Sequence, residues 1–213
     1  EIEGYQKVIN GARAVLDNYR PRILIHPDLP MGELGACLTS VGSGVTPRGG
    51  KETYVTEGIL FIRSQNVLFG QCDFSDAAYI TRETHEEMSR SKVRKGDVFL
   101  NITGASIGRS AVMQLDVEAN VNQHVAVLRT KPELLPIFLS TFLNSDVGQR
   151  QIDGFQAGAS REALNYSQIK QLKIPVPPLA TQQQIVVEIE SEQALVAANR
   201  ELLTRFEKKI QAT

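Results

Sequence analysis

Apolar positions near both ends of the chain recur every three or four residues, whereas those in the middle come in short runs. In the first segment the steps alternate between four and three, at Tyr5, Ile9, Ala12, Leu16 and Tyr19. This heptad spacing is typical of a helix that packs lengthwise on another helix. Pro21 ends the predicted helix, because proline cannot continue the hydrogen-bond ladder of a helix.

The last segment carries a longer seam of the same kind. We expect its helix to start at a capping box of Thr181 and Gln184, just after Pro177-Pro178. About 29 helical residues would span roughly 43 Å. Polar residues inside a seam cost stability but fix register and partner. The seam positions are Ile185, Ile189, Glu192, Val196, Asn199, Leu203, Phe206 and Ile210. A helix lying across its own globular domain is the alternative.

Between these helices the chain has the pattern of a mixed domain. Runs rich in β-branched residues and bounded by glycine or polar turns predict strands. They lie at Gly58 to Arg63, Asp97 to Thr103, Arg109 to Gln114, Val121 to Arg129 and Lys173 to Val176. A helix should follow Pro132, and Asn165 should cap a short one. We therefore predict an α+β fold with a mixed-strand globular domain (22–178), an N-terminal helix (1–21) and a long C-terminal coiled-coil-type helix (179–213).

Composition narrows the class of protein only modestly. The 213 residues include 23 Lys and Arg against 24 Asp and Glu, for a net charge of -1. Nucleic-acid binders usually carry a basic excess, so the balance weakly disfavours them. No apolar run approaches membrane-spanning length and no secretion leader opens the chain, so we expect a cytoplasmic protein without a membrane partner. Cys37 and Cys72 should be reduced thiols.

Two glycine-containing loops could approach phosphate groups. The stretch from Gly42 to Lys51 lacks the spacing of a nucleotide-binding loop, and Glu52 replaces the hydroxyl residue such a loop needs. It nevertheless offers Thr46, Arg48 and Lys51 as phosphate contacts, with a plain surface turn as the alternative. The second loop runs from Thr103 to Arg109, and we favour a tight strand connection over a phosphate contact as its role.

Two polar clusters contain the residue types that read base edges. Asn and Gln pair bidentately with adenine, and Arg pairs with guanine. The candidates for base reading are Arg63, Gln65, Asn66, Asn122 and Gln123. The alternative is that these amides satisfy loop backbone groups, as Asn and Gln often do.

The sequence contains little that indicates an enzyme active site. His26, His85 and His124 lack the spacing of metal ligands, so we predict no metal site. No serine sits in a nucleophile elbow. We could assemble no set of nucleophile, base and metal, and we predict a non-catalytic chain.

The ordered series of motifs resembles the target recognition domain and adjoining conserved helix of type I restriction-modification specificity subunits. The likeness covers nearly the whole chain, and its most specific part is the entry into the long helix. The motifs are Tyr19-Arg20-Pro21, Ser43-Gly44-Val45-Thr46-Pro47, Phe61-Ile62-Arg63-Ser64-Gln65-Asn66, Lys95-Gly96-Asp97, Asn101-Ile102-Thr103-Gly104, Asn122-Gln123-His124, Gly158-Ala159-Ser160-Arg161 and Pro177-Pro178-Leu179 with Gln182.

The resemblance implies a module that reads one half of a bipartite DNA target and docks adenine methyltransferase subunits. S-adenosylmethionine would be bound by the methyltransferase and not by this chain, and a restriction subunit is a further possible partner. The motif positions add Ser160 and Arg161 to the phosphate candidates. A full subunit of the family has two recognition domains, so the chain is either a half-subunit that pairs through its helices or part of a longer or fused chain. A helical interaction module without DNA specificity is the alternative function.

Overall fold

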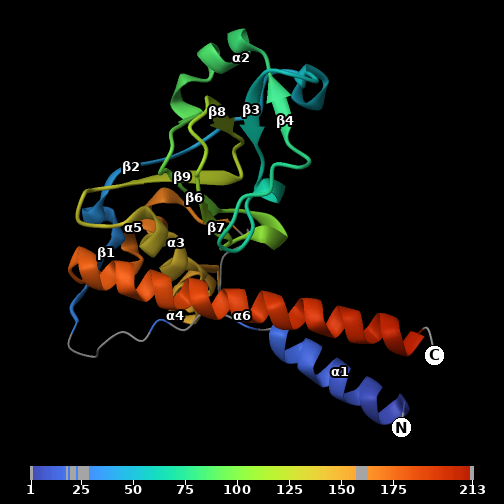
Figure 1. Cartoon of the computed structure of the whole chain (residues 1–213). Coiled ribbons are helices and arrows are strands. Elements are labelled where there is room, and N and C mark those ends of the chain that lie inside the picture. The colour runs from blue at the N-terminus through green and yellow to red at the C-terminus, as the bar shows by residue number, and fades with distance from the viewer. Residues whose placement is uncertain (1, 18, 20–22, 24–28, 157–162, 212–213) are drawn as a thin grey trace.

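A four-stranded antiparallel sheet forms the middle layer of the globular part (Figure 1). The computed structural model describes residues 2–17, 19, 23, 29–156 and 163–211. Val98 and Leu100 face the helices, while Phe99 between them faces a second sheet, so both faces are buried. In spatial order the strands are β2 (Leu38–Ser43), β9 (Val125–Thr130), β6 (Val98–Asn101) and β7 (Ser110–Val112).

The second sheet packs on one face of the first and holds the far end of the globule. Leu60 and Ile62 point toward the first sheet, whereas Ile59 and Phe61 pack on the other side with Met88. Met88 directly follows helix α2 (Arg82–Glu87). In spatial order the strands are β4 (Ala78–Ile80), β3 (Ile59–Ile62), β8 (Ala119–Val121) and β5 (Lys92–Val93), with β3 and β8 parallel.

Three helices and a small two-stranded sheet cover the other face of the middle layer. Phe138 and Phe142 of the first helix are fully buried in the largest apolar cluster. These elements are α3 (Pro136–Asn144), α4 (Asp146–Gln156), α5 (Tyr166–Gln171), β1 (Met31–Glu33) and β10 (Lys173–Pro175). Short 3-10 turns lie between these elements, at Leu34–Cys37, Gly50–Thr53, Ser64–Asn66, Ser89–Ser91 and Gly104–Ser106.

The long helix α6 (Leu179–Gln211) begins on the globule and projects away from it beside α1 (Ile2–Asp17) (Figure 1). Its first turns are buried through Gln182, Val186 and Ile189. At 1.5 Å per residue its 33 residues span roughly 50 Å. None of the described helices has the length and apolar character needed to cross a membrane.

The two helices run antiparallel and are tied together along their length. Arg13 Nη2 lies 2.5 Å from Glu207 Oε2, and Arg200 Nη2 donates to the carbonyl of Leu16 at 2.5 Å. Nearer the globule, the Tyr19 hydroxyl donates to Glu192 Oε2 at 2.7 Å. The predicted α+β class, with a helix at each end of the chain, is confirmed.

Two details of the predicted elements are wrong. The segment predicted as one strand from Val121 to Arg129 is two strands in different sheets, because the chain turns at Asn122 and crosses from β8 to β9. Thr181 does not cap α6, since the helix already begins at Leu179 and the Thr181 amide donates to the carbonyl of Pro178. The 22–178 and 179–213 domain division stays a prediction.

Candidate nucleic-acid interface

The crossing between the two sheets carries one of the predicted polar clusters. Asn122 Oδ1 accepts a hydrogen bond from the His124 amide at 3.0 Å, which turns the chain between β8 and β9. Gly44 packs against this crossing, and its amide donates to the carbonyl of Asn122 at 3.1 Å. A Cβ at Gly44 would lie 1.6 Å from the carbonyl oxygen of Val121, so only glycine permits this approach.

Side chains from three separate segments of the chain meet at this crossing, in what we call the crossing network (Thr46, Gln123, His124 and Thr103). The Thr46 hydroxyl donates to Gln123 Oε1. Gln123 Nε2 therefore donates to His124 Nε2 at 3.1 Å, which leaves the proton of the neutral ring on Nδ1, 2.5 Å from Thr103 Oγ1. Thr46 and Gln123 are exposed, so the network presents an oriented amide at the surface.

The remaining phosphate candidates of the glycine-rich loop are open to solvent. Arg48 and Lys51 are exposed, and neither side chain has an ion pair or hydrogen bond within the described residues. Gly49 and Gly50 between them have φ values of 95° and 62°, a conformation that favours glycine and turns the loop.

The other predicted base-reading cluster is bonded within the chain. Arg63 Nη2 donates to the carbonyl of Asp76 at 2.5 Å, and Gln65 Nε2 donates to Asp76 Oδ2 at 2.7 Å. Asn66 is 2% exposed, and its amide bonds the backbone of Arg63 and Asp73. For Asn66, and for most of the Arg63 side chain, this geometry matches the alternative in which polar groups satisfy their own loop.

Arg109 also has a partner within the chain. Its guanidinium carbon lies 5.9 Å from the centroid of the Phe69 ring, a cation–π arrangement. Ser160 and Arg161 lie outside the described residues. The structure thus joins Thr46 to Gln123, while the Arg63 segment and Arg109 each make separate contacts.

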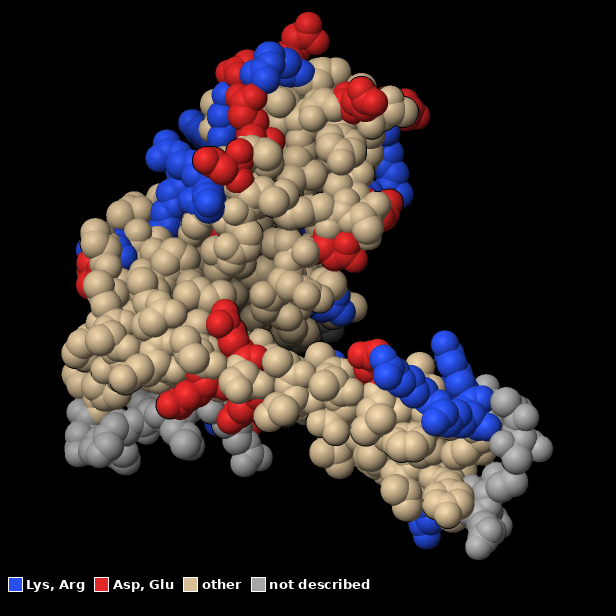
Figure 2. Space-filling view, viewed as in Figure 1, with Lys and Arg blue, Asp and Glu red and all other residues tan. Residues whose placement is uncertain are grey.

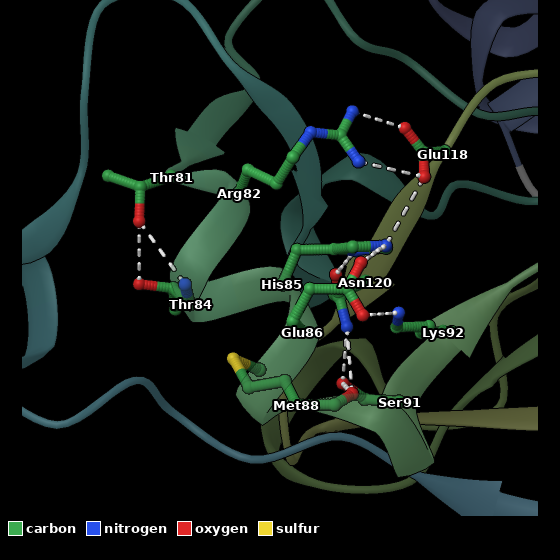
Figure 3. A network of polar contacts seen from close by, with 10 residues as sticks. All are labelled: Thr81, Arg82, Thr84, His85, Glu86, Met88, Ser91, Lys92, Glu118 and Asn120. Atoms are coloured by element: carbon green, nitrogen blue, oxygen red, sulfur yellow. Dashed lines mark hydrogen bonds and ion pairs between the residues drawn. The ribbon is translucent and has the colours of Figure 1, made fainter.

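A network at the tip of the globule fixes α2 to the second sheet (Figure 3). Asn120 Nδ2 donates to the carbonyl of Met88 and to Ser91 Oγ, at 3.0 and 2.8 Å. Its Oδ1 is therefore the acceptor facing His85 Nδ1 at 2.5 Å. His85 is 3% exposed, so this buried pair holds the end of α2 and residues 88–91 against β8.

Ion pairs complete the tip network on its outer side. Arg82 binds both oxygens of Glu118, and Lys92 Nζ lies 2.7 Å from Glu86 Oε2. These hydrogen bonds lower the pKa values of the Glu118 and Glu86 carboxyls. Both acids thus stay ionised and paired.

His85, Glu86 and Glu118 are also the group of described residues whose ligand atoms lie near enough to hold a metal ion, all within 4.8 Å. Lys92 and Arg82 already neutralise the two carboxylates. A divalent cation would have to displace them, so we describe the group as an ion-pair network. That the chain has no metal site stays a prediction.

Sequence reasoning missed a basic strip directly after α2, which we define as Arg90, Lys92 and Arg94. Figure 2 shows Lys and Arg side chains gathered on the flank of the globule below α2. The signal was present in the sequence, because Arg90 to Lys95 contains four basic residues and no acid. It was hidden by counting charge over whole regions, in which neighbouring acids cancel it.

The predicted seam residues divide between two faces of the helix pair. Ile9 is buried and Leu16 half-buried on α1, opposite the half-buried residues of α6. Those are Val196, Leu203 and Ile210. Nearer the start of α6, Ile185 packs against the largest apolar cluster of the globule and Ile189 is buried. Tyr5 and Phe206 are 61% and 48% exposed, and Asn199 is also exposed.

The chain is similar to type I specificity subunits in sequence and in fold. It is 32% identical over 139 residues to the type I restriction enzyme EcoBI specificity subunit of Escherichia coli, covering 64% of this chain and 29% of that protein. The EcoKI specificity subunit of E. coli strain K12 is 26% identical over 149 residues, 68% of this chain and 31% of the relative.

Solved structures extend the likeness to nearly the whole chain. The HsdS subunit of Thermoanaerobacter tengcongensis matches with a TM-score of 0.61 at 19% identity, over 99% of this chain and 51% of that one. A chain from a study of assembly and conformational transition of a type I R-M system matches with a TM-score of 0.72 at 17% identity, over the same shares. This chain therefore spans about half the length of these structures.

The family described as the type I restriction modification DNA specificity domain matches residues 50–203, which is more than half of the chain. The match includes the crossing network apart from Thr46, the tip network, the basic strip and most of α6. The chain belongs to the type I restriction-modification DNA specificity domain family.

Proposed function

We propose that this chain is a non-catalytic module that recognises one half of a bipartite DNA target for a type I restriction-modification system. The observation that carries the proposal is the family match over residues 50–203. The crossing network supports it, because hydrogen bonds orient an exposed Gln123 amide beside the glycine-rich loop. A positioned amide is the group that pairs bidentately with adenine in the major groove.

Exposure and pairing rank the candidate contacts. Gln123 and Asn122 are the favoured base readers, since both lie at the crossing and Gln123 is exposed. Arg48 and Lys51 are the favoured phosphate contacts of the glycine-rich loop, because their charges are exposed and unpaired within the described residues. Arg63, Gln65 and Asn66 lie outside the crossing network, and each is bonded to residues 73–76.

The chemistry of methylation and cleavage would come from partner subunits in the cytoplasm. We propose that the methyltransferase subunit binds S-adenosylmethionine and that this chain needs no cofactor. Contacts with the methyltransferase, and with a restriction subunit where one is present, would use surfaces outside the DNA-reading loops.

The helix pair offers an apolar face for a second recognition half. On α6, Leu195, Asn199, Leu202 and Phe206 repeat at steps of four, three and four and are all exposed; we call them the outer seam. On α1, Val8 and Val15 are 70% and 72% exposed.

These two apolar rows lie on the same side of the helix pair. At 100° per residue, each row is displaced in the same rotational sense from the seam that joins the two helices. In an antiparallel pair, rows displaced in the same sense share one face. Two such faces would form a four-helix bundle, which buries apolar rows between helix pairs. We propose that a second recognition half docks here.

Methylome sequencing of a host that expresses this chain with its methyltransferase subunit tests the proposal. We expect methylated adenines in one bipartite motif. Gln123→Ala should relax one position of that motif, since a bidentate base contact contributes about 1–3 kcal/mol of discrimination. Gln65→Ala is the matched control, because Gln65 is an exposed glutamine outside the crossing network.

The opposing result is equally clear. If the wild-type complex shows no sequence preference on duplex DNA at any salt concentration, the chain is a helical interaction module and the DNA-recognition proposal is wrong. The outer seam would then be its main functional surface.

A further inference from the structure

The basic strip begins in the 3-10 turn Ser89–Ser91 and continues along β5. Ser91 and Val93 are buried, whereas Arg90 and Arg94 are exposed and Lys92 is half-buried. From Lys92 to Arg94 the side chains alternate as in an extended chain, in which successive side chains point to opposite faces. β5 is an edge strand of the second sheet, paired only with β8, so the cations lie at the rim of the globule.

Two of the three cations in the strip are not paired with an acid among the described residues. Neither guanidinium of Arg90 and Arg94 makes an ion pair or hydrogen bond within the described part of the chain. Lys92 pairs with Glu86, while Arg129 behind it pairs with Asp97 at 2.8 Å. The strip therefore adds two uncompensated positive charges in a molecule whose net charge is -1.

These cations line a hollow of about 300 Å³. Arg90, Lys92, Arg94 and Arg129 contribute to its wall, together with Glu118. The carboxylate of Glu118 is held by Arg82 through both oxygens, so it does not cancel the free guanidinium groups. The hollow has the charge and the donor groups to bind phosphate oxygens.

The hollow continues toward the glycine-rich loop. A second hollow of about 180 Å³ shares Ser89 and Arg90 with the first, and its other wall is Ser43, Gly44 and Val45. A third hollow of about 410 Å³ shares Val45 and Met88 with the second and reaches Thr46 and Arg48. Adjoining through these shared residues, the three hollows make a row from the basic strip to Thr46 of the crossing network, which we call the groove. Glu87 and Glu118 are the exposed acids on its wall.

We propose that the basic strip binds backbone phosphates of the target DNA and that the groove leads the duplex backbone to the crossing network. This inference rests on the proposed DNA-recognition function and names a phosphate site for it. The tip network positions the strip, because Asn120 anchors residues 88–91 and Glu86 holds Lys92 (Figure 3).

A different role for the same residues gives a different result. Charged side chains on edge strands prevent pairing with other sheets, and β5 is such an edge. If edge protection were the only role, removing the charges would promote aggregation and leave DNA binding unchanged.

The test measures duplex binding by the full chain with its methyltransferase subunit over a salt series. The probes are an unmethylated duplex that contains the motif found by methylome sequencing and a duplex in which that motif is scrambled. In R90Q/R94Q, binding to both duplexes should weaken equally. The magnitude of the slope of log K against log salt should decrease by about 1.8, because each lost phosphate contact removes about 0.9. R90K/R94K should keep the wild-type slope.

A charge-matched control removes two cations elsewhere. K170Q/K208Q changes the net charge equally at two exposed helix positions without described partners and should leave the slope unchanged. An equal loss in this control would attribute the effect to net charge and overturn the inference. An unchanged slope in R90Q/R94Q, with or without aggregation, would also overturn it. Failure of the wild-type complex to prefer its motif would instead refute the proposed function.

Discussion

The segment around Arg63 and the basic strip both contain arginine beside other polar residues, but their side chains differ in whether they have partners within the chain. Arg63 is flanked by Gln65 and Asn66, a composition suited to base reading, yet all three bond to the chain between residues 73 and 76. Arg90 and Arg94 have no such partners among the described residues. The first segment stabilises a loop, and the second leaves charge available to a ligand.

The difference arises from residues far from either segment. Asp76 returns to Arg63 because β3 and β4 pair antiparallel, and Asn101 of β6 donates to the carbonyl of Ser64 at 2.8 Å. Among the described residues no acid or carbonyl bonds the Arg90 side chain, which lies in the 3-10 turn before the edge strand β5. A residue's availability for binding is therefore set by topology, which residue type alone does not reveal.

The largest effect should come from overpacking the contact between the glycine-rich loop and the crossing of β8 and β9. In Gly44→Ala the new Cβ would lie 1.6 Å from the carbonyl oxygen of Val121, so the loop or β8 must move. We expect the free energy of unfolding to fall by roughly 3 kcal/mol, the upper range for overpacking. Urea denaturation measures this change.

Gly42→Ala is the matched control, since nothing lies within 4 Å of its added Cβ. It should be neutral or stabilise the fold by up to about 1 kcal/mol. Equal stability of the two variants would mean that the close approach of Gly44 to the crossing is not formed in solution.

The next effect separates structural from reading amides in the Arg63 segment. Asn66→Ala removes buried bonds to the backbone of Arg63 and Asp73 and should lower the free energy of unfolding by about 2 kcal/mol. Gln65→Ala, at an exposed position, should change it by less than about 0.5 kcal/mol. A stable Asn66→Ala protein that relaxes one position of the motif would make Asn66 a base reader and reverse our comparison.

Local pattern was enough to predict much of the fold. Asn165 caps α5 as predicted, and its capping box with Gln168 is a bond within four residues. The hairpin of β6 and β7 follows from apolar runs joined by a glycine-bounded turn. Each of these features depends on neighbours in sequence, which is why sequence alone reveals them.

Features that depend on distant partners were missed. Gln182 belongs to the motif at the start of the long helix, but its sequence context does not reveal that it is fully buried and bonds the backbone of Leu135, Glu133 and Pro177. The segment Val121 to Arg129 reads as one strand because both of its halves are buried, although they belong to different sheets. The site residues were predictable as polar clusters, whereas the turn at Asn122 and the pairing of Thr46 with Gln123 depend on the fold.

The outer seam of α6 also contains a polar side chain that is available to a partner, the exposed amide of Asn199. Asn199 lies exposed in the outer seam and donates only to the carbonyl of Leu195, at 2.7 Å. Asn199→Leu should strengthen the docked form by roughly 1–2 kcal/mol through apolar burial, and it should also broaden the oligomer distribution. Light scattering and thermal melting measure both.

Thr204→Leu is the control on the opposite side of α6, where the hydroxyl makes the same kind of bond to the carbonyl of Arg200, at 3.0 Å. It should leave the oligomer distribution unchanged. A single unaltered species in Asn199→Leu would show that the outer seam does not dock a second half.

The smallest effect concerns Tyr19, a polar group whose partner is within the chain. Partial burial, followed by the hydrogen bond and charge of Glu192, raises the pKa of the Tyr19 phenol to about 12 from its ordinary value near 10. Since the folded pKa is the higher one, the stabilisation is complete below about pH 10 and is lost as the pH rises through about 12.

Alkaline titration at 295 nm tests this pairing, with circular dichroism to confirm that the helices persist. Subtracting the Tyr19→Phe titration from that of the wild type should leave one ionisation near pH 12, and Glu192→Gln should move it toward 10 because the carboxylate no longer opposes phenolate formation. An ionisation already near 10 in the wild type would mean that Tyr19 is unpaired in solution. In that case α1 would be joined to α6 through its apolar seam and the contacts of Arg13 and Leu16, farther from the globule. The polar groups at the junction nearest the globule would then be without partners, as those of Arg90 and Arg94 in the basic strip are among the described residues.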